Sequence, residues 1–217
     1  MITVYSFTVN PFQENSYLLT DETRRCVIVD AGFYSPEEKE QFGAFIEKNE
    51  LLPIALVNTH CHFDHLLGIP FLKKKYDLPL YCHRDEAFWL ATAAQQSSFF
   101  GINFQDTLTA DHYLDEGDEV RWGNSALKVI HVPGHSRGHL VLWSPEDQFL
   151  LTGDVLFRGS IGRTDLEGGN YTSLITHIHR KLMVLPDETV VYSGHGPATT
   201  IGAEKSGNPF LKVPPGE

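Results

Sequence analysis

The segment Thr59-His60-Cys61-His62-Phe63-Asp64-His65 constrains this 217-residue chain more than any other feature. Within six positions it supplies four side chains that can bind a metal ion, namely His60, His62, Asp64 and His65. A short apolar run at residues 54–57 precedes it and predicts a buried strand, so the four side chains should lie on a turn at the carboxyl end of that strand. Imidazole and carboxylate groups are ligands for zinc, and also for iron or manganese. We therefore expect a metal site at this turn.

Three further residues of ligand type follow predicted strands in the same way, and each stands next to a glycine. They are His135 in Pro133-Gly134-His135, Asp154 in Gly153-Asp154, and His195 in Gly194-His195-Gly196. Glycine has no β-carbon, so it lets a backbone segment or an ion approach closely. This repeated placement indicates that the three residues belong to the same metal site.

The rest of the pattern predicts a mixed α+β or α/β fold in a single domain, residues 1–217, with halves of about 1–117 and 118–217. Strands are expected at residues 2–9, 16–20, 26–30, 54–57, 80–82, 119–122, 125–131, 140–143, 148–152 and 189–193. Helices are expected at residues 36–49, 66–76, 85–96 and 171–184, and residues 97–110 are expected to form a loop or lid. Ser35, Pro36 and Glu38 have the pattern of a capping box at the start of the first helix. Strand runs followed by helices, twice over, suggest two similar halves with the sheets packed together and the helices outside.

Composition excludes several classes of partner. The formal charge of −11 opposes sequence-independent binding to nucleic acid or to anionic lipid, because both require a basic face. No apolar run approaches the length of a membrane helix, and residues 1–6 lack the features of a secretory signal. Cys26, Cys61 and Cys82 are odd in number and form no Cys-x-x-Cys pair, so they are not a complete disulfide framework. We expect a cytoplasmic protein that binds neither nucleic acid nor membrane, and its oligomeric state stays open.

In this order, His-x-His-x-Asp-His, Pro-Gly-His, Gly-Asp and Gly-His-Gly-Pro resemble the metallo-β-lactamase superfamily. The chain is most similar to the short glyoxalase II-like members of that superfamily, the hydroxyacylglutathione hydrolase-like enzymes. Asn10-Pro11-Phe12 and Gly162-Arg163-Thr164-Asp165 support the resemblance, which extends over nearly the whole chain. It implies a four-layer αββα sandwich made of two similar halves.

The resemblance also implies a binuclear metal site with seven ligands. One ion would be held by His60, His62 and His135, and the other by Asp64, His65 and His195, with Asp154 bridging the two. Zinc is the expected metal, with iron or manganese as alternatives. The implied reaction is hydrolysis of a small-molecule thioester, such as S-D-lactoylglutathione, by a metal-activated bridging hydroxide. Asp64 and Asp154 would be the catalytic carboxylates.

Four other side chains each allow two interpretations. Arg163 could bind a substrate carboxylate or pair with Asp165, and we favour the pair. Tyr171, at the start of a predicted helix, is a weaker candidate for contact with substrate. His139 could orient a metal ligand or make a purely structural hydrogen bond. Cys61 could bind zinc as a thiolate, but a packed free thiol is favoured.

Several other functions are compatible with the same motifs. A persulfide dioxygenase-like enzyme would bind one iron ion and has a similar Gly-Arg-Thr-Asp segment, but residues 193–197 look more like those of the hydrolases. A lactonase is a further alternative. A non-catalytic scaffold protein should lack ligands, yet all seven are present, and an RNA-cleaving enzyme would need an inserted nuclease domain. The number of bound metal ions and the uptake of oxygen would separate the dioxygenase from the hydrolase.

Overall fold

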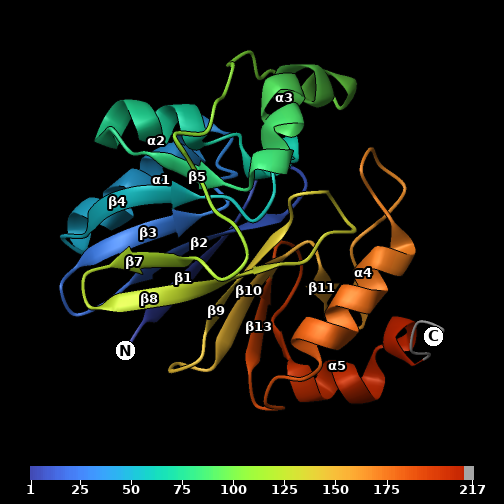
Figure 1. The fold of residues 1–217 in the computed structure, drawn as a ribbon. Helices are drawn as coiled ribbons and strands as arrows, with labels where there is room; N and C mark the ends of the chain where they lie inside the picture. Colours follow the sequence, from blue (N-terminus) through green and yellow to red (C-terminus); the bar gives the residue numbers. More distant parts are fainter. Residues whose placement is uncertain (213–217) are drawn as a thin grey trace.

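Two β-sheets face each other and helices cover the outer face of each in the computed structural model, which describes residues 1–212 (Figure 1). This confirms the predicted mixed fold with two sheets flanked by helices. The second predicted half, residues 118–217, ends with five residues outside the described range. Among residues 1–212, no helix is both long enough and apolar enough to cross a membrane.

The first sheet has six strands, which lie side by side in the order of the sequence. They are β1 (Thr3–Val9), β2 (Glu14–Thr20), β3 (Arg25–Val29), β4 (Leu52–Val57), β5 (Leu80–Cys82) and β6 (His112–Tyr113). β1, β2 and β3 are antiparallel, whereas β3, β4, β5 and β6 are parallel. Parallel neighbours need long crossover connections. Here these contain α1 (Pro36–Lys48), α2 (Ile69–Tyr76) and α3 (Ala87–Phe99).

The second sheet has the order β14-β13-β10-β9-β8-β7. Its strands are β7 (Glu119–Trp122), β8 (Ser125–His131), β9 (Leu140–Ser144), β10 (Phe149–Gly153), β13 (Val190–Ser193) and β14 (Thr199–Thr200). β10 and β13 are parallel, and the connection between them contains the hairpin of β11 (Leu156–Phe157) and β12 (Ser160–Ile161), followed by α4 (Tyr171–His177). α5 (Ile201–Gly207) follows β14.

Three apolar cores separate the four layers. Side chains alternate across a strand, so consecutive residues reach different cores. In β2, Leu18 packs beneath the helices of the first sheet, whereas Leu19 packs between the two sheets. In β10, Leu151 faces the core between the sheets, whereas Leu150 packs with Leu174 of α4. Central strands such as β3 and β10 are therefore buried on both faces and read as apolar runs, whereas the edge strand β7 alternates between buried and exposed residues.

Several predicted boundaries are wrong. The helix predicted at residues 66–76 begins at Ile69, because residues 63–65 form a 3-10 turn, η1 (Phe63–His65), and Gly68 is the N-cap. The helix predicted at residues 171–184 ends at His177 and continues as a π-helical turn, η3 (Ile178–Leu182). The predicted capping box at Ser35 is confirmed, with Glu38 contributing the second side chain.

The shortest elements were not predicted. β6, β11, β12 and β14 have two residues each, which is too short for any periodicity to be visible. The region predicted as a loop or lid, residues 97–110, is irregular except that α3 continues to Phe99. Its first residues lie at the mouth of the cavity described below.

Candidate metal centre

The seven predicted ligands lie on four loops, each of which follows a strand. The loop after β4 carries His60, His62, Asp64 and His65, and the loops after β8, β10 and β13 carry His135, Asp154 and His195. Because β4 belongs to the first sheet and the other three strands to the second, the ligands meet where the two sheets pack together. Gly194 permits this closeness, since a β-carbon there would lie 2.3 Å from Oδ1 of Asp154.

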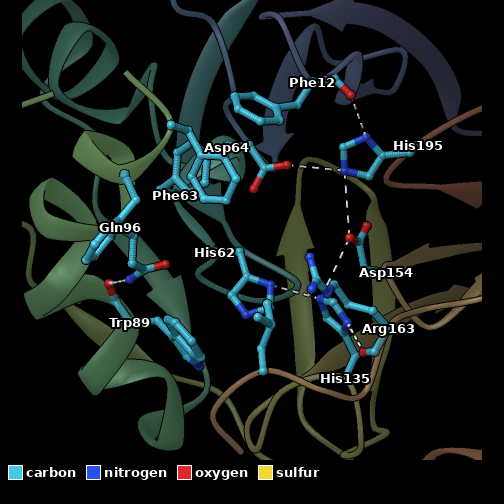
Figure 2. A pocket seen from close by; sticks show the side chains of 13 residues that line it. Phe12, His62, Phe63, Asp64, Trp89, Gln96, His135, Asp154, Arg163 and His195 are labelled. Atoms are coloured by element: carbon cyan, nitrogen blue, oxygen red, sulfur yellow. Dashed lines mark hydrogen bonds and ion pairs between the residues drawn. The ribbon is translucent and has the colours of Figure 1, made fainter. Parts of the chain in front are cut away.

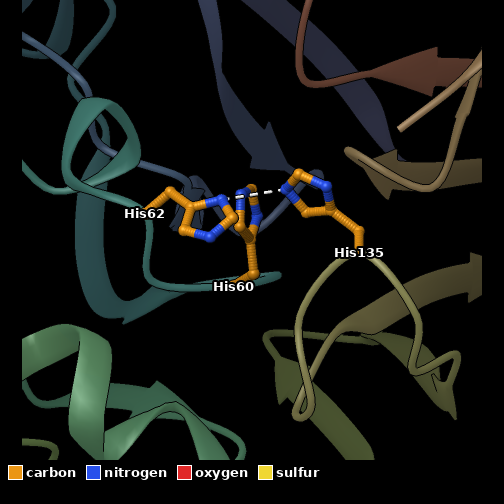
Figure 3. A group of neighbouring side chains, drawn as sticks. All are labelled: His60, His62 and His135. Atoms are coloured by element: carbon orange, nitrogen blue, oxygen red, sulfur yellow. Dashed lines mark hydrogen bonds between the residues drawn. The ribbon is translucent and has the colours of Figure 1, made fainter. Parts of the chain in front are cut away.

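His60, His62 and His135 form the first group (Figure 3). One nitrogen from each ring lies within 4.8 Å of the others, and all three side chains are buried. Nδ1 of His62 and Nε2 of His135 are 2.9 Å apart. Nε2 of His60 and Nε2 of His62 have no hydrogen-bond partner among the described residues. Buried polar atoms rarely remain unpaired, so this donor set fits a cation.

Asp64, His65 and His195 form the second group, again with ligand atoms within 4.8 Å of one another. Oδ2 of Asp64 is 3.3 Å from Nε2 of His195 and 3.9 Å from Nε2 of His65. Both ring nitrogens of His65 are buried without a hydrogen-bond partner among the described residues. This group offers the mixed nitrogen and oxygen donors that suit a zinc, iron or manganese ion.

Asp154 lies between the two groups. Its Oδ1 is 3.6 Å from Nε2 of His65, and its Oδ2 is 3.7 Å from Nε2 of His135 and 3.7 Å from Nε2 of His195. A single carboxylate therefore faces ligand atoms of both groups (Figure 2).

Backbone carbonyls orient two of the imidazoles. Nδ1 of His135 lies 2.8 Å from the carbonyl oxygen of Arg163, and Nδ1 of His195 lies 3.1 Å from that of Phe12. A carbonyl can only accept, so each Nδ1 carries the hydrogen and each Nε2 presents a lone pair to the centre. The two rings are thereby held in the tautomer that a metal ion requires.

Sequence analysis did not identify two acidic residues beneath His65. Asp30, at the end of β3, accepts hydrogen bonds from the backbone N–H and the hydroxyl of Thr59, both at 2.7 Å. Its Oδ2 is also 3.3 Å from Nδ1 of His65, and Oε1 of Glu14 is 3.7 Å from the same nitrogen. Asp30-Ala31-Gly32 stands at a strand end beside a glycine, as Gly153-Asp154 does, so the sequence contained a signal for Asp30. We found no comparable signal for Glu14.

The two groups of ligands differ in charge. Burial lowers the pKa of His60, His62 and His135, so these imidazoles favour the neutral form that binds a cation. Burial alone would raise the pKa of Asp64, but the neighbouring His65 and His195 outweigh it and hold that pKa below its usual range. Burial would lower the pKa of His65, yet Asp64 and Asp154 raise it. The second group therefore combines an ionised carboxylate with an imidazole that favours its charged form, and a bound cation would displace that proton.

A cavity of about 460 Å³ opens above this centre. Its floor includes His62, Asp64, His135, Asp154 and His195. A water molecule or a small substrate can therefore reach both groups of ligands.

The structure places His139, Cys61, Arg163 and Tyr171, the four other candidate side chains, in different surroundings. Nε2 of His139 accepts a hydrogen bond from the backbone N–H of Asp154 at 3.0 Å, and its ring stacks on His60. His139 therefore supports two ligands. Cys61 is buried in the core beneath the helices of the first sheet, and it belongs to none of the ligand groups found among the described residues.

Arg163 lines the cavity, and its guanidinium binds Asp165 through two hydrogen bonds of 2.8 and 2.7 Å. The favoured ion pair is therefore present. Tyr171 is half exposed at the first turn of α4 and is not among the described residues that line the cavity. Both remain predictions as contacts with substrate.

Glu86 was also missed. It ends a 3-10 turn, η2 (Arg84–Glu86), and its fully buried carboxylate accepts hydrogen bonds from the backbone N–H groups of Cys61 and Gly138, each at 2.8 Å. Cys61 lies between His60 and His62, and Gly138 lies three residues after His135. Glu86 therefore connects the two loops that carry the first group of ligands. Nothing in the local sequence distinguishes it from a surface residue of a helix.

Comparison with known proteins agrees with this geometry. The Metallo-beta-lactamase superfamily matches residues 9–195. "Probable metallo-hydrolase YqgX" of Bacillus subtilis is 39% identical over 204 residues, which cover 94% of each chain. "Hydroxyacylglutathione hydrolase GloC" of Haemophilus influenzae is 35% identical over 205 residues, which cover 94% of this chain and 95% of the relative. The chain belongs to the metallo-beta-lactamase superfamily of metallo-hydrolases, which confirms the resemblance found in the sequence.

Solved structures support the same assignment. The BLEG-1 B3 metallo-beta-lactamase is 37% identical with a TM-score of 0.89, covering 97% of this chain and 100% of that one. TTHA1623 in a di-iron-bound form is 37% identical with a TM-score of 0.85, and the match covers 95% of this chain and 100% of that one. ETHE1 from Myxococcus xanthus is 26% identical with a TM-score of 0.79, and the match covers 95% of this chain and 83% of that one. One of these similar structures thus contains a pair of iron ions.

Proposed function

We propose that this chain is a binuclear metallo-hydrolase that cleaves a thioester such as S-D-lactoylglutathione. The observation that carries the proposal is the position of Asp154, whose carboxylate oxygens lie 3.6 to 3.7 Å from ligand atoms of both groups. A carboxylate in this position suits a pair of ions better than a single ion. The similarity to the hydroxyacylglutathione hydrolase GloC supports a thioester as substrate. Because both sheets contribute ligands, we also propose that the chain acts as one domain.

Two divalent ions, Zn²⁺ in this proposal, would be held by the seven ligands and would supply a lowered water pKa and polarisation of the substrate carbonyl. The first group of ligands would hold one ion and the second group the other, with Asp154 shared. Asp64 stays ionised because its pKa is held low, so it can accept a hydrogen bond from the attacking water and orient it.

The reaction consumes one water molecule. Its oxygen bonds to the carbonyl carbon, the carbon–sulfur bond breaks, and the sulfur receives a proton. The products are a carboxylic acid and a thiol. No serine or cysteine nucleophile is required, which agrees with the buried position of Cys61.

Metal analysis of the purified protein, combined with turnover of S-D-lactoylglutathione, tests this proposal. We expect about two ions per chain and hydrolysis that depends on them. His62→Ala should lose both bound metal and turnover, whereas the neighbouring Cys61→Ala should retain both. One iron ion per chain, with oxygen uptake and no thioester turnover, would refute the proposal in favour of a dioxygenase.

A further inference from the structure

One side of the cavity is apolar and faces away from most of the ligands. We call it the apolar wall, and it consists of Phe12, Phe63, Trp89, Phe99, Phe100 and Leu166. Figure 2 shows Phe63 and Trp89 across the cavity from His135 and Asp154, and Phe12 at one end of the cavity, near His195. A lactoyl group has only a methyl group to place against this wall, so the proposed reaction alone does not explain it.

The rings of the apolar wall pack in two sets. The Trp89 ring lies edge-on to the ring of His62, a predicted ligand, with centroids 4.5 Å apart. Phe63 and Phe100 are stacked at 5.0 Å, and Phe12 packs edge-on against both, at 5.1 and 5.5 Å. Because Trp89 lies against His62, a group bonded directly to a carbonyl at the metal centre would contact this part of the apolar wall.

The outer end of the apolar wall is open to solvent. Phe99 is 79% exposed and Phe100 is 58% exposed, and both border the cavity. Exposed aromatic rings that line a concave site are typical of a surface that a ligand covers. Covering these rings removes apolar surface from water, which favours binding of an apolar group.

The opposite side of the cavity has few cationic side chains that could bind a negatively charged group. Among the described residues that line the cavity, Arg163 is the only lysine or arginine. Its guanidinium is already bound to Asp165, and the hydrogen bonds from Arg163 lower the pKa of Asp165 to about 2. The cavity therefore provides a large apolar surface on one side and one partly engaged cation on the other.

We infer that the acyl group of the preferred thioester is aromatic, or otherwise bulky and apolar, and packs on the apolar wall. The thiol carrier then extends along the side of Arg163 toward solvent. This inference rests on the proposed thioester hydrolysis and adds the class of acyl group. The bonds that form and break are those of the hydrolysis given above.

Two thioesters of the same thiol provide the test. S-mandeloylglutathione and S-D-lactoylglutathione differ by a phenyl ring in place of a methyl group, so the ratio of their kcat/KM values isolates the acyl side chain. A single methylene group in an apolar pocket changes kcat/KM by roughly 10-fold or more, so we expect the mandeloyl ester to be preferred by at least about 10-fold. Phe100→Ala should reduce this preference by about 5-fold, because it removes an exposed ring of the apolar wall.

Phe210→Ala is the matched control. Phe210 is 41% exposed and is not among the described residues that line the cavity, so this substitution should leave the ratio unchanged. Turnover of both esters with no preference for the mandeloyl ester overturns the inference and leaves the proposed function standing. Equal loss of preference in Phe100→Ala and Phe210→Ala also overturns it. Turnover of neither ester by the metal-loaded protein overturns the proposed function, and the inference with it.

Discussion

Replacing Glu86 by glutamine should weaken the binding of metal without removing a ligand. Both oxygens of Glu86 accept hydrogen bonds from backbone N–H groups, one at Cys61 and one at Gly138. Glutamine has one acceptor oxygen, so its amide NH₂ must face the second N–H as one donor against another. The two loops that carry His60, His62 and His135 would then lose one of their two connections through this side chain.

The change in the free energy of unfolding caused by Glu86→Gln is the sum of two opposing contributions. Leaving one buried N–H without a partner costs about 1–3 kcal/mol. Burial raises the pKa of Glu86, so the ionised carboxylate is itself costly to bury, and neutral glutamine avoids part of this cost. We expect a net loss of about 1–2 kcal/mol in the free energy of unfolding, which corresponds to about 2–8 °C in Tm for a chain of this size. Metal affinity should fall about 10- to 100-fold, as is usual when a group that orients ligands is removed.

Competition with a chelator measures the affinity, and thermal unfolding of the metal-free protein measures the stability. Glu204→Gln is the matched control, since Glu204 is also buried and accepts hydrogen bonds from Gly159, Thr199 and Asn208, away from the ligands. It should lower the Tm by a similar amount while leaving metal affinity unchanged. The proposed role of Glu86 in orienting the ligand loops is refuted if Glu86→Gln binds metal as tightly as the wild type, or if both variants weaken metal binding equally.

Three further results are expected. Removal of both metal ions by a chelator should lower the Tm by about 10–20 °C, because each ion at 100 times its Kd stabilises the folded state by about 2.7 kcal/mol. An unchanged Tm would contradict the assignment of the unpaired nitrogens of His60, His62 and His65 as ligands. The buried thiols of Cys26, Cys61 and Cys82 should resist iodoacetamide at pH 8 until the chain is unfolded. Burial raises the pKa of Cys26 to about 12, which leaves roughly one thiolate in ten thousand at that pH, and rapid alkylation of the folded protein would disprove this. Gly194→Ala should reduce metal content, since the added β-carbon would meet Asp154 and His65, whereas Gly207→Ala, with no atom within 4 Å of its β-carbon, should have no effect in the same metal analysis.

The candidate ligands could be predicted from the sequence for a physical reason. All seven follow predicted strands: four stand together within residues 60–65, and His135, Asp154 and His195 each stand next to a glycine. The sheets could also be predicted, because buried strands such as residues 54–57 read as apolar runs. Asp30 stood in the same setting and could have been identified.

Glu86 and Glu14 could not have been identified in this way. Glu86 acts through N–H groups 25 and 52 residues away in the chain, so its role depends on the packing of α3 against two distant loops. The two-residue strands β6 and β14 also depend on contacts with other parts of the fold. β6 pairs with β5 and β14 pairs with β13, and two residues are too few for their own sequence to predict a strand without the neighbouring strand beside them. Such features depend on tertiary contacts, which a local pattern does not report.

The position of the candidate centre has an energetic consequence for the whole molecule. The sheets are held together by the apolar core between them, and the ligands lie at one end of that core, with His60 and His65 from the first sheet facing His135, Asp154 and His195 from the second. Nε2 of His60 is desolvated by this packing and has no partner among the described residues, so without a cation it opposes the packing. A bound cation would pair with this nitrogen and join the two sheets. We therefore expect metal binding and packing of the sheets to be coupled.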